Sequence, residues 1–338
     1  MDQDTSPAIP LRILGTGEYV PSRQVPSEAF DQRWGKPAGW TRRHVGIDCR
    51  YFADAGETAS FMAARAAHEA LRRAGLEAGG MDAIISVGSV PEQAIPCTAA
   101  LVQRQLGLSA STIPAFDINA TCLGFLVALD LVAGAFATGR FRRVLLVAGE
   151  VASAGLDWND TDTAALFGDG AAAVVLEGGS QAGDSRLLAT HMETHSEGAA
   201  FCQVRAGGTR VRLDDGVDAY AEASKFEMSG KATYRLAAQR LPRFLQRLFA
   251  RAGITVEDLR KLVPHQASAK ALDHLEVALR LPPGALVRIL ADHGNQMAAS
   301  IPLALHHAIE RGELRQGDRF AMVGSGAGLS FAGAVLRL

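Results

Sequence analysis

The sequence predicts a layered α/β fold built from two similar halves. HEALRRAGLEAGGMDAIISVG, from His68, aligns with QRLFARAGITVEDLRKLVPHQ, from Gln246, about half a chain later. Both segments have the pattern of an amphipathic helix closed by glycine, an acidic turn and a β-branched strand. Such a period far exceeds the roughly 20–50 residues of solenoid repeats, so it indicates a duplicated domain. The alternation of helices with buried strands favours α/β layering.

A second, looser match extends the duplication along each copy. LVAGAFATGRFRRVLLVAGE followed by LFGDGAAAVVLEGG resembles LALHHAIERGELRQGDRFAMVGSG followed by LSFAGAVLRL. We therefore predict halves at 1–180 and 181–338, packed face to face with helices between and outside their sheets. The stretch 194–222 is glycine-rich and aperiodic, which is typical of an insertion loop near the surface.

The segment from Leu123 to Gly139 is long enough for a helix and apolar on nearly every side except at Asp130. A helix of this kind is buried in a core. Cys122 precedes it, where unpaired N–H groups and the helix dipole favour a thiolate. The dipole contributes at most ~2 kcal/mol, or about 1.5 pKa units. We therefore expect the pKa of this thiol to lie near neutrality, and a nucleophile here would need help from a nearby histidine. The alternative is a small core residue.

Composition limits the possible partners and compartments. The 338 residues are 48% hydrophobic and 21% charged with a formal net charge of −2, which gives no electrostatic case for nucleic acid or a membrane surface. The four cysteines are scattered without a CxxC pair, so a zinc finger or disulfide scaffold is disfavoured and a reducing cytoplasm is expected. MDQDTSPAIPLRILG lacks the pattern of a signal peptide. Asp130 favours a core helix over a membrane span.

Three further strings contain polar residues or glycines: VPHQAS at 263–268, HGNQMAASIP at 293–302 and GSGAGLSFAG at 324–333. Taken singly, His265 at a strand end and Asn295 after a glycine have ordinary structural explanations. Only ten residues follow Gly328, too few for the helix and acidic residue of a dinucleotide fingerprint. We interpret these glycines as a place where the backbone closely approaches a ligand.

Together with DINATCLGF and LFGDGAAAVVL, these ordered strings resemble the thiolase-fold condensing enzymes, and more narrowly the β-ketoacyl-acyl-carrier-protein synthase III group. The resemblance runs from GTGEYVPSRQV to the final strand. It implies a duplicated α/β/α/β/α fold with halves related by a pseudo-two-fold axis. It also implies a cytoplasmic, homodimeric acyltransferase that condenses an acyl-CoA with malonyl-acyl-carrier protein, with loss of CO2. Coenzyme A would be part of the substrate, and no cofactor is expected.

The resemblance assigns roles to the residues at the reacting centre. Cys122 would carry the acyl group, and the backbone amides of Cys122 and Ala327 would hold the oxyanion. His265 and Asn295 would polarise the carbonyl of the malonyl thioester. A neutral histidine and an asparagine both donate hydrogen bonds without protonating the carbanion that forms.

The resemblance also implies substrate contacts outside the centre. Trp40, in WTRRHVGIDCRYFA, would stack on the CoA adenine. Ile95 would cross a dimer interface and shape the partner's acyl pocket, where a bulky phenylalanine is commonest, so an acyl group longer than acetyl is expected. The remaining candidates are a pantetheine contact, two glycines of the terminal loop and two carrier-protein cations: Ser268, Gly326, Gly328, Arg235 and Lys270.

Two departures bear on the acyl donor. His44 and Thr161 stand where the family usually has arginines, which weakens the expected grip on a nucleotide phosphate. Arg42 and Arg43 lie close enough in sequence to compensate. An acyl-carrier-protein donor is therefore an alternative to CoA.

Two further pairs of histidines lie outside these motifs. His191 and His195 are four residues apart, but they flank a predicted strand start and no third ligand is evident, so we predict no metal there. His306 and His307 lie in an amphipathic segment and are expected at a surface or interface.

Three other functions compete with a condensing enzyme. One is a diverged member of the family in specialised metabolism or cofactor supply, with an unusual acyl starter or a non-carbon acceptor. Another is a papain-type cysteine hydrolase, which is disfavoured because its CGSC-like string is absent. The third is a non-catalytic binding subunit, which would have no physical need for the cysteine, histidine and asparagine together.

Overall fold

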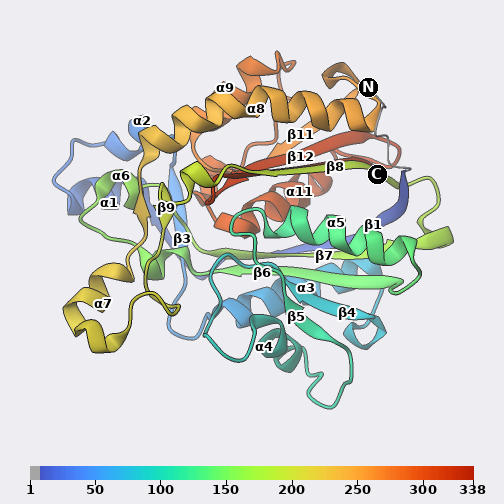
Figure 1. Ribbon diagram of the computed structural model, residues 1–338, viewed down its shortest axis with the longest axis horizontal. Coiled ribbons are helices and arrows are strands. Elements are labelled where there is room, and N and C mark those ends of the chain that lie inside the picture. The colour runs from blue at the N-terminus through green and yellow to red at the C-terminus, as the bar shows by residue number, and fades with distance from the viewer. Residues whose placement is uncertain (1–7) are drawn as a thin grey trace.

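The computed structural model describes residues 8–338, and Figure 1 shows its five layers. Helices α8 (Gly230–Ala252) and α9 (Ala269–Ala278) cover the outer face of one sheet. Helices α3 (Ala59–Ala74) and α4 (Thr98–Gln105) cover the outer face of the other. Between the sheets lie α5 (Gly124–Ala137) and α11 (Ser300–Glu310). The predicted α/β/α/β/α layering is confirmed.

The strand topology repeats itself. The first half has the order β5-β4-β6-β7-β1 and the second β11-β12-β13-β8. In each, a parallel pair (β4 with β6, β11 with β12) is followed by two antiparallel pairings. The strands are β1 (Ile9–Tyr19), β4 (Ala83–Ser86), β5 (Ala115–Asp117), β6 (Arg143–Glu150), β7 (Gly170–Gly178), β8 (Arg186–Thr194), β11 (Lys261–Pro264), β12 (Arg319–Gly326) and β13 (Ser330–Arg337). This equivalence confirms the duplicated fold.

A short contact joins the halves at β1 and β8. Ile9 pairs with Leu187 and Pro10 with Arg186, so that the strands form one nine-stranded sheet that folds over. The predicted boundary near residue 180 falls in the connection between β7 and β8 and stays a prediction.

The helix expected at 123–139 is α5, and it is the centre of the core. Phe125, Leu129 and Val132 are buried in a cluster that takes side chains from strands of both halves. The helix can start close to β4 because Gly124 has no side chain: a Cβ there would lie 2.3 Å from the carbonyl oxygen of Val87. None of the helices formed by residues 8–338 is long and apolar enough to cross a membrane.

Smaller elements lie at one end of the layers. They are α1 (Ser27–Arg33), α2 (Trp40–Val45), α6 (Thr161–Ala164), α10 (Leu290–His293) and the antiparallel pair β2 (Arg23–Pro26) and β3 (Cys49–Phe52). Short 3₁₀ helices occur within 78–80, 152–155, 179–182, 196–198, 213–215, 256–258 and 297–299.

The segment expected to be an aperiodic loop, 194–222, contains regular structure, so that prediction was partly wrong. Cys202–Gln203 forms β9, which pairs with β10 (Glu227–Met228), and Val217–Ala223 forms helix α7. VDAYAEA contains three alanines and a glutamate, which are good helix formers and suit a short helix. Part of this segment lies at the surface, because Leu213 and Val217 are mostly exposed.

Candidate active site

Cys122 lies in a tight turn, two residues before the first residue of α5. Thr121 adopts a left-handed backbone with φ of 51°. Its amide donates to the Asn119 side chain at 2.9 Å, and the Leu123 amide donates to the Ala120 carbonyl at 3.1 Å. The turn therefore presents Cys122 at the N-terminal end of the buried helix.

Two glycines of β12 let this turn and the histidine strand approach the same place. A Cβ on Gly326 would lie 2.8 Å from Thr121 Oγ1. A Cβ on Gly324 would lie 2.9 Å from Leu123 Cδ2 and 3.0 Å from His265 Cβ. Both gaps are too small for a side chain, so glycine is what brings the cysteine turn and His265 together on β12.

His265 directly follows the last residue of β11 and is buried. Its amide donates to the Val323 carbonyl on β12 at 2.8 Å, and its ring Nδ1 lies 2.5 Å from Ser300 Oγ at the start of α11. Burial lowers the pKa of His265 to about 4. The ring is therefore neutral at pH 7, and Nε2 is the nitrogen left for a substrate.

Asn295 is held between the halves by its backbone. Its amide donates to the Leu166 carbonyl at 2.8 Å, and its carbonyl accepts from the Gly168 amide at 3.2 Å. The side-chain Oδ1 accepts from the Met297 amide at 2.9 Å, and Nδ2 lies 3.5 Å from the Ala267 carbonyl. Because Oδ1 is occupied, Asn295 is oriented as a donor through Nδ2, close to the segment that carries His265.

Sequence reasoning missed Glu150, a buried acid at the end of β6. Its Oε1 accepts from the Ser89 amide at 2.6 Å and from the Ala298 amide at 3.2 Å. Burial raises the pKa of this carboxyl to about 7. Glu150 thus ties the segment after β4 to the segment after Asn295. The only sequence signal was an acid closing the apolar strand RVLLVAGE.

The prediction that the Cys122 thiol has a pKa near neutrality was wrong. Burial raises the pKa to about 12, and the charges of Glu150 and Cys202 act in the same direction. A helix terminus supplies at most ~2 kcal/mol, which is less than the cost of ionising a buried thiol beside a carboxylate. The thiol is therefore protonated at rest, and the placement of Cys202 near it was not foreseen.

The predicted adenine contact at Trp40 is occupied by a side chain. The His44 ring stacks on Trp40 with centroids 4.5 Å apart and an angle of 16°, and His44 Nε2 lies 3.0 Å from Asp162 Oδ1. Thr161 begins α6 and supplies no cation.

The arginines expected to compensate make other contacts. Arg42 Nε pairs with Asp48 at 2.9 Å, and Arg43 donates to the Ala38 carbonyl at 2.9 Å. These contacts leave neither arginine in place of the cations that are absent at His44 and Thr161.

A pocket between α8 and α9 reaches His265. Its lining includes Tyr234 of α8, Ala271 of α9 and Phe331 of β13. Arg235 and Lys270 adjoin Tyr234 and Ala271 in sequence and are exposed. Each predicted carrier-protein cation is therefore exposed and one residue away in sequence from the lining of a pocket that leads to a predicted catalytic residue.

Of the other predicted contact residues, some lie near the cysteine turn and others do not. Ser268 caps α9, since its Oγ accepts from the Ala271 amide at 3.2 Å, so its hydroxyl is engaged. Ala327 and Gly328 lie in the turn between β12 and β13, next to Gly326 and hence to the cysteine turn. Ile95 is 84% exposed in the segment before α4 and makes no part of the centre in a single chain.

A cysteine turn from one half, with a histidine and an asparagine from the other on a duplicated α/β/α/β/α scaffold, is the arrangement of a thiolase-fold condensing enzyme. Sequence profiles agree. Residues 116–196 match the family 3-oxoacyl-[acyl-carrier-protein] synthase III, and 249–338 match its C-terminal family. The chain belongs to the β-ketoacyl-[acyl-carrier-protein] synthase III family and is a condensing acyltransferase, as the motifs predicted.

Full-length relatives support this assignment. The chain is 37% identical over 328 residues to a β-ketoacyl-[acyl-carrier-protein] synthase III of Rhodobacter capsulatus, covering 96% of this chain and 98% of the relative. The same description applies to a protein of Granulibacter bethesdensis with 35% identity and the same coverage.

Solved structures agree as well. The 3-oxoacyl-[acyl-carrier-protein] synthase III of Aquifex aeolicus superposes with a TM-score of 0.88 at 31% identity, covering 97% of this chain and 100% of that one. The priming β-ketosynthase of the R1128 polyketide pathway superposes with a TM-score of 0.86 at 29% identity, covering 97% and 96%. The papain-type alternative is excluded by the fold.

Proposed function

We propose that this protein catalyses a decarboxylative Claisen condensation of an acyl thioester with malonyl-acyl-carrier protein, through an acyl-Cys122 intermediate. The observation that carries the proposal is the convergence on β12 of the Cys122 turn and His265, with Asn295 Nδ2 beside the segment following His265.

The first half-reaction transfers the acyl group. Because its pKa is about 12, the Cys122 thiol must lose its proton as sulfur attacks the acyl carbonyl. The new carbon–sulfur bond forms to Cys122, the bond to the donor thiol breaks, and that thiol leaves with a proton. The amides of Cys122 and Ala327 would hold the oxyanion of the tetrahedral intermediate.

The second half-reaction makes and uses the carbanion. Ser300 Oγ can donate to Nδ1 of His265, which leaves the ring proton on Nε2. His265 Nε2–H and Asn295 Nδ2–H then both donate hydrogen bonds to the thioester oxygen of the malonyl group. The bond to the carboxylate breaks, CO2 leaves, and its electron pair forms an enolate that attacks acyl-Cys122. The cysteine departs as thiolate and takes up a proton from solvent, which balances the loss of the carboxylate as CO2.

The pocket and the surroundings of Trp40 indicate which acyl donors the protein uses. The exposed cations Arg235 and Lys270 follow or precede lining residues of the pocket between α8 and α9, which suits an acidic carrier protein. Since His44 covers Trp40, we infer that acyl transfer depends more on the pantetheine thioester than on the adenine of CoA. Both acyl-CoA and acyl-carrier protein are candidate donors.

A second candidate function is a priming synthase of specialised metabolism with an unusual or longer acyl starter. Two observations favour it: the absence of fixed arginines at His44 and Thr161, and the likeness to the R1128 priming synthase.

We also propose a cytoplasmic homodimer. β5 is an edge strand, and the exposed apolar side chains of Phe116 on β5, Val90 and Ile95 lie on the same part of the chain. A second copy would cover them. All four cysteines are free thiols, which suits a reducing compartment. Ile95→Asp should shift the protein to monomer in light-scattering measurements, and an unchanged mass would contradict the dimer surface.

Mass spectrometry tests the reaction. Incubation with acyl-CoAs or acyl-carrier proteins should add an acyl mass to the wild type and none to Cys122→Ala. His265→Ala and Asn295→Ala should still be acylated but should fail to release CO2 from malonyl-acyl-carrier protein. His68→Ala, on the exposed side of α3, is the matched control and should behave as wild type. Absence of an adduct with every donor would defeat the proposal.

A further inference from the structure

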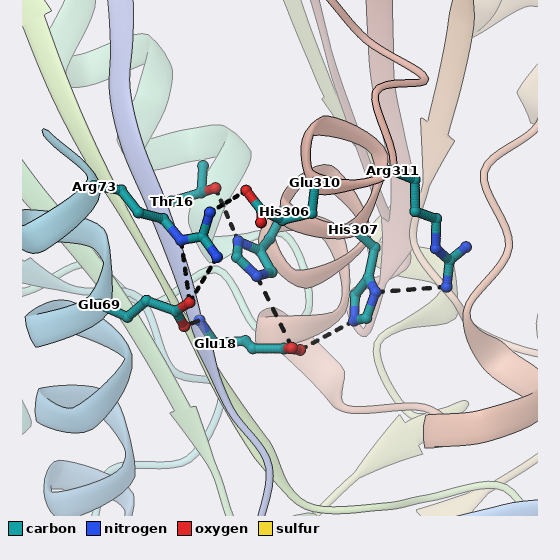
Figure 2. Close-up of polar contacts among 8 residues, drawn as sticks. All are labelled: Thr16, Glu18, Glu69, Arg73, His306, His307, Glu310 and Arg311. Atoms are coloured by element: carbon teal, nitrogen blue, oxygen red, sulfur yellow. Dashed lines mark hydrogen bonds and ion pairs between the residues drawn. The ribbon is translucent and has the colours of Figure 1, made fainter.

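Three ligand-type side chains outside the reacting centre meet at one point between β1 and α11. Glu18 comes from the end of β1, His293 closes α10, and His307 lies in α11. One carboxylate oxygen of Glu18 and one ring nitrogen of each histidine all lie within 4.8 Å of one another. Figure 2 shows the Glu18 carboxylate reaching toward both His306 and His307.

The distances among these side chains are somewhat longer than those among the ligands of a bound metal ion. His307 Nε2 lies 3.0 Å from Glu18 Oε2, and the His293 and His307 ring centroids are 5.1 Å apart. His306 Nε2 lies 3.9 Å from Glu18 Oε1. Ligands about 2.0–2.2 Å from a tetrahedral zinc are about 3.3 Å from each other, so closure needs only small side-chain rotations.

The hydrogen bonding of His293 already leaves one ring nitrogen free to bind a metal ion. Its Nδ1 lies 3.1 Å from the Ile289 carbonyl, and because a carbonyl only accepts, Nδ1 carries the proton. Nε2 therefore holds the free electron pair. A histidine whose other nitrogen donates to a backbone carbonyl is the common outer arrangement of metal-binding imidazoles.

Glu18 is also held in place by its neighbours, whereas His307 has only a weak contact at its other ring nitrogen. The backbone amide of Glu18 donates to Glu69 at 3.0 Å, and Glu69 in turn pairs with Arg73 (Figure 2). His307 Nδ1 lies 3.5 Å from Arg311. Metal binding at Nε2 would move the ring proton to Nδ1 and release that weak contact. The side chains of Glu18 and His307 are 28% and 17% exposed, which leaves a path from solvent.

We propose that Glu18, His293 and His307 form a binding site for a divalent transition-metal ion, with Zn²⁺ the ion best suited to two imidazoles and one carboxylate. This donor set leaves a fourth position for water, or for His306 after a small movement. Hard ions such as Mg²⁺ prefer an all-oxygen shell and should not compete. The site takes no part in the proposed condensation, but His293 is two residues from Asn295, so bound metal would steady the loop that carries Asn295.

A second cluster in the chain provides a contrast. His191 and His195 both contact Glu193, at 2.9 and 3.2 Å. There Arg247 lies 2.7 Å from the same carboxylate and neutralises it. No such cation contacts the Glu18 side chain among the contacts of residues 8–338. Charge thus favours a cation at Glu18 and not at Glu193.

The test is direct metal binding by the full chain after dialysis against a chelator. Calorimetry should show one Zn²⁺ per chain, and Co²⁺ should give the visible absorption of a nitrogen- and oxygen-ligated ion without a thiolate charge-transfer band. Glu18→Gln and His307→Ala should each weaken Zn²⁺ binding at least about tenfold. His195→Ala and Cys122→Ala should bind as the wild type does, and excess Mg²⁺ should not displace Zn²⁺.

Melting temperatures measured without metal show whether each variant is folded, with Glu18→Gln as the nearly isosteric substitution. Failure of the wild type to bind Zn²⁺, or unchanged binding by a folded Glu18→Gln variant, would overturn the proposal. Because binding is measured without any acyl substrate, this outcome is independent of the proposed condensation.

Discussion

His265 and Ser300 are joined by a short contact, with the ring Nδ1 of His265 2.5 Å from the Ser300 hydroxyl oxygen. The two residues are 35 positions apart and come from the end of β11 and the start of α11. The Gln266 amide also lies 3.3 Å from that oxygen. Since the amide donates to the hydroxyl oxygen, the hydroxyl proton is free to be donated to Nδ1. When the hydroxyl donates to Nδ1, the ring carries its proton on Nε2, which is the tautomer that the proposed decarboxylation requires.

We predict that Ser300→Ala slows decarboxylation while acylation of Cys122 continues. Loss of the hydrogen bond removes about 1 kcal/mol that orients the His265 ring, which corresponds to a roughly fivefold lower rate, and it leaves the tautomer unselected. CO2 release and acyl-enzyme mass would be measured on the same preparation. Ser300→Thr retains a hydroxyl and should recover part of the rate. Equal losses in both half-reactions would contradict a role through His265.

The lowered pKa of His265 leads to a second prediction, about how decarboxylation depends on pH. Because burial lowers it from 6.5 to about 4, the ring stays neutral across the range in which an exposed histidine titrates. Malonyl decarboxylation by Cys122→Ala should therefore show no loss centred near 6.5, and should hold from about pH 7 to about pH 5. A fall with a midpoint near 6.5 would show that His265 is solvated.

The lowered pKa of His265 also makes the stability of the fold depend on pH. Between pH 6.5 and about 4 the unfolded chain binds a proton at this position and the folded protein does not. Stability from this group is therefore present above pH 6.5 and is lost as pH falls through that window. His265→Ala should flatten this part of the dependence of melting temperature on pH.

The layered fold could be predicted because its causes are local. The repeat of helix, glycine and strand at His68 and Gln246, and the apolar surface of the helix after Cys122, are visible in the residues themselves. The cysteine, histidine and asparagine were located by ordered motifs, and the family they indicated is confirmed. Their roles remain predictions.

The electrostatics of the site could not be predicted, because they depend on which distant segments pack together. Glu150 is 28 residues from Cys122 in sequence, yet its charge raises the thiol's pKa. In the same way, nothing in the order of residues indicates that His44 would cover Trp40, or that Glu18 would meet His307 from the opposite half. The helix α7 was missed because its seven residues are too few to show a helical period.

Alkylation should reveal the raised pKa of Cys122. With a pKa of about 12, its reaction with iodoacetamide should rise with pH and reach no plateau below about pH 10. Glu150→Gln keeps an acceptor for the Ser89 and Ala298 amides but removes the charge, so it should lower the pKa and speed alkylation. Cys122→Ala corrects for the other thiols. A plateau near neutral pH would restore the helix-dipole interpretation.

His44 should decide how well the protein uses CoA. His44→Ala uncovers one face of Trp40, and base stacking on an aromatic side chain contributes about 1–3 kcal/mol. We expect KM for acyl-CoA to fall at least about fivefold, with little change for acyl-carrier protein, which has no adenine. Steady-state kinetics with both donors would measure this. Equal changes for the two donors would contradict adenine stacking at Trp40.

Gly324 and Gly134 provide a matched pair that tests how β12 brings the site together. A Cβ at Gly324 would press on Leu123 at 2.9 Å and on His265 at 3.0 Å, whereas at Gly134, exposed within α5, it would meet nothing within 4 Å. Overpacking costs about 1–3 kcal/mol, so Gly324→Ala should lower the melting temperature and reduce both acylation and decarboxylation. Gly134→Ala should instead stabilise the protein by about 0.5–1 kcal/mol and leave both half-reactions unchanged, because alanine is the better helix former. If Gly324→Ala had normal rates of acylation and decarboxylation, close packing of the cysteine turn and His265 on β12 would not be needed for the chemistry.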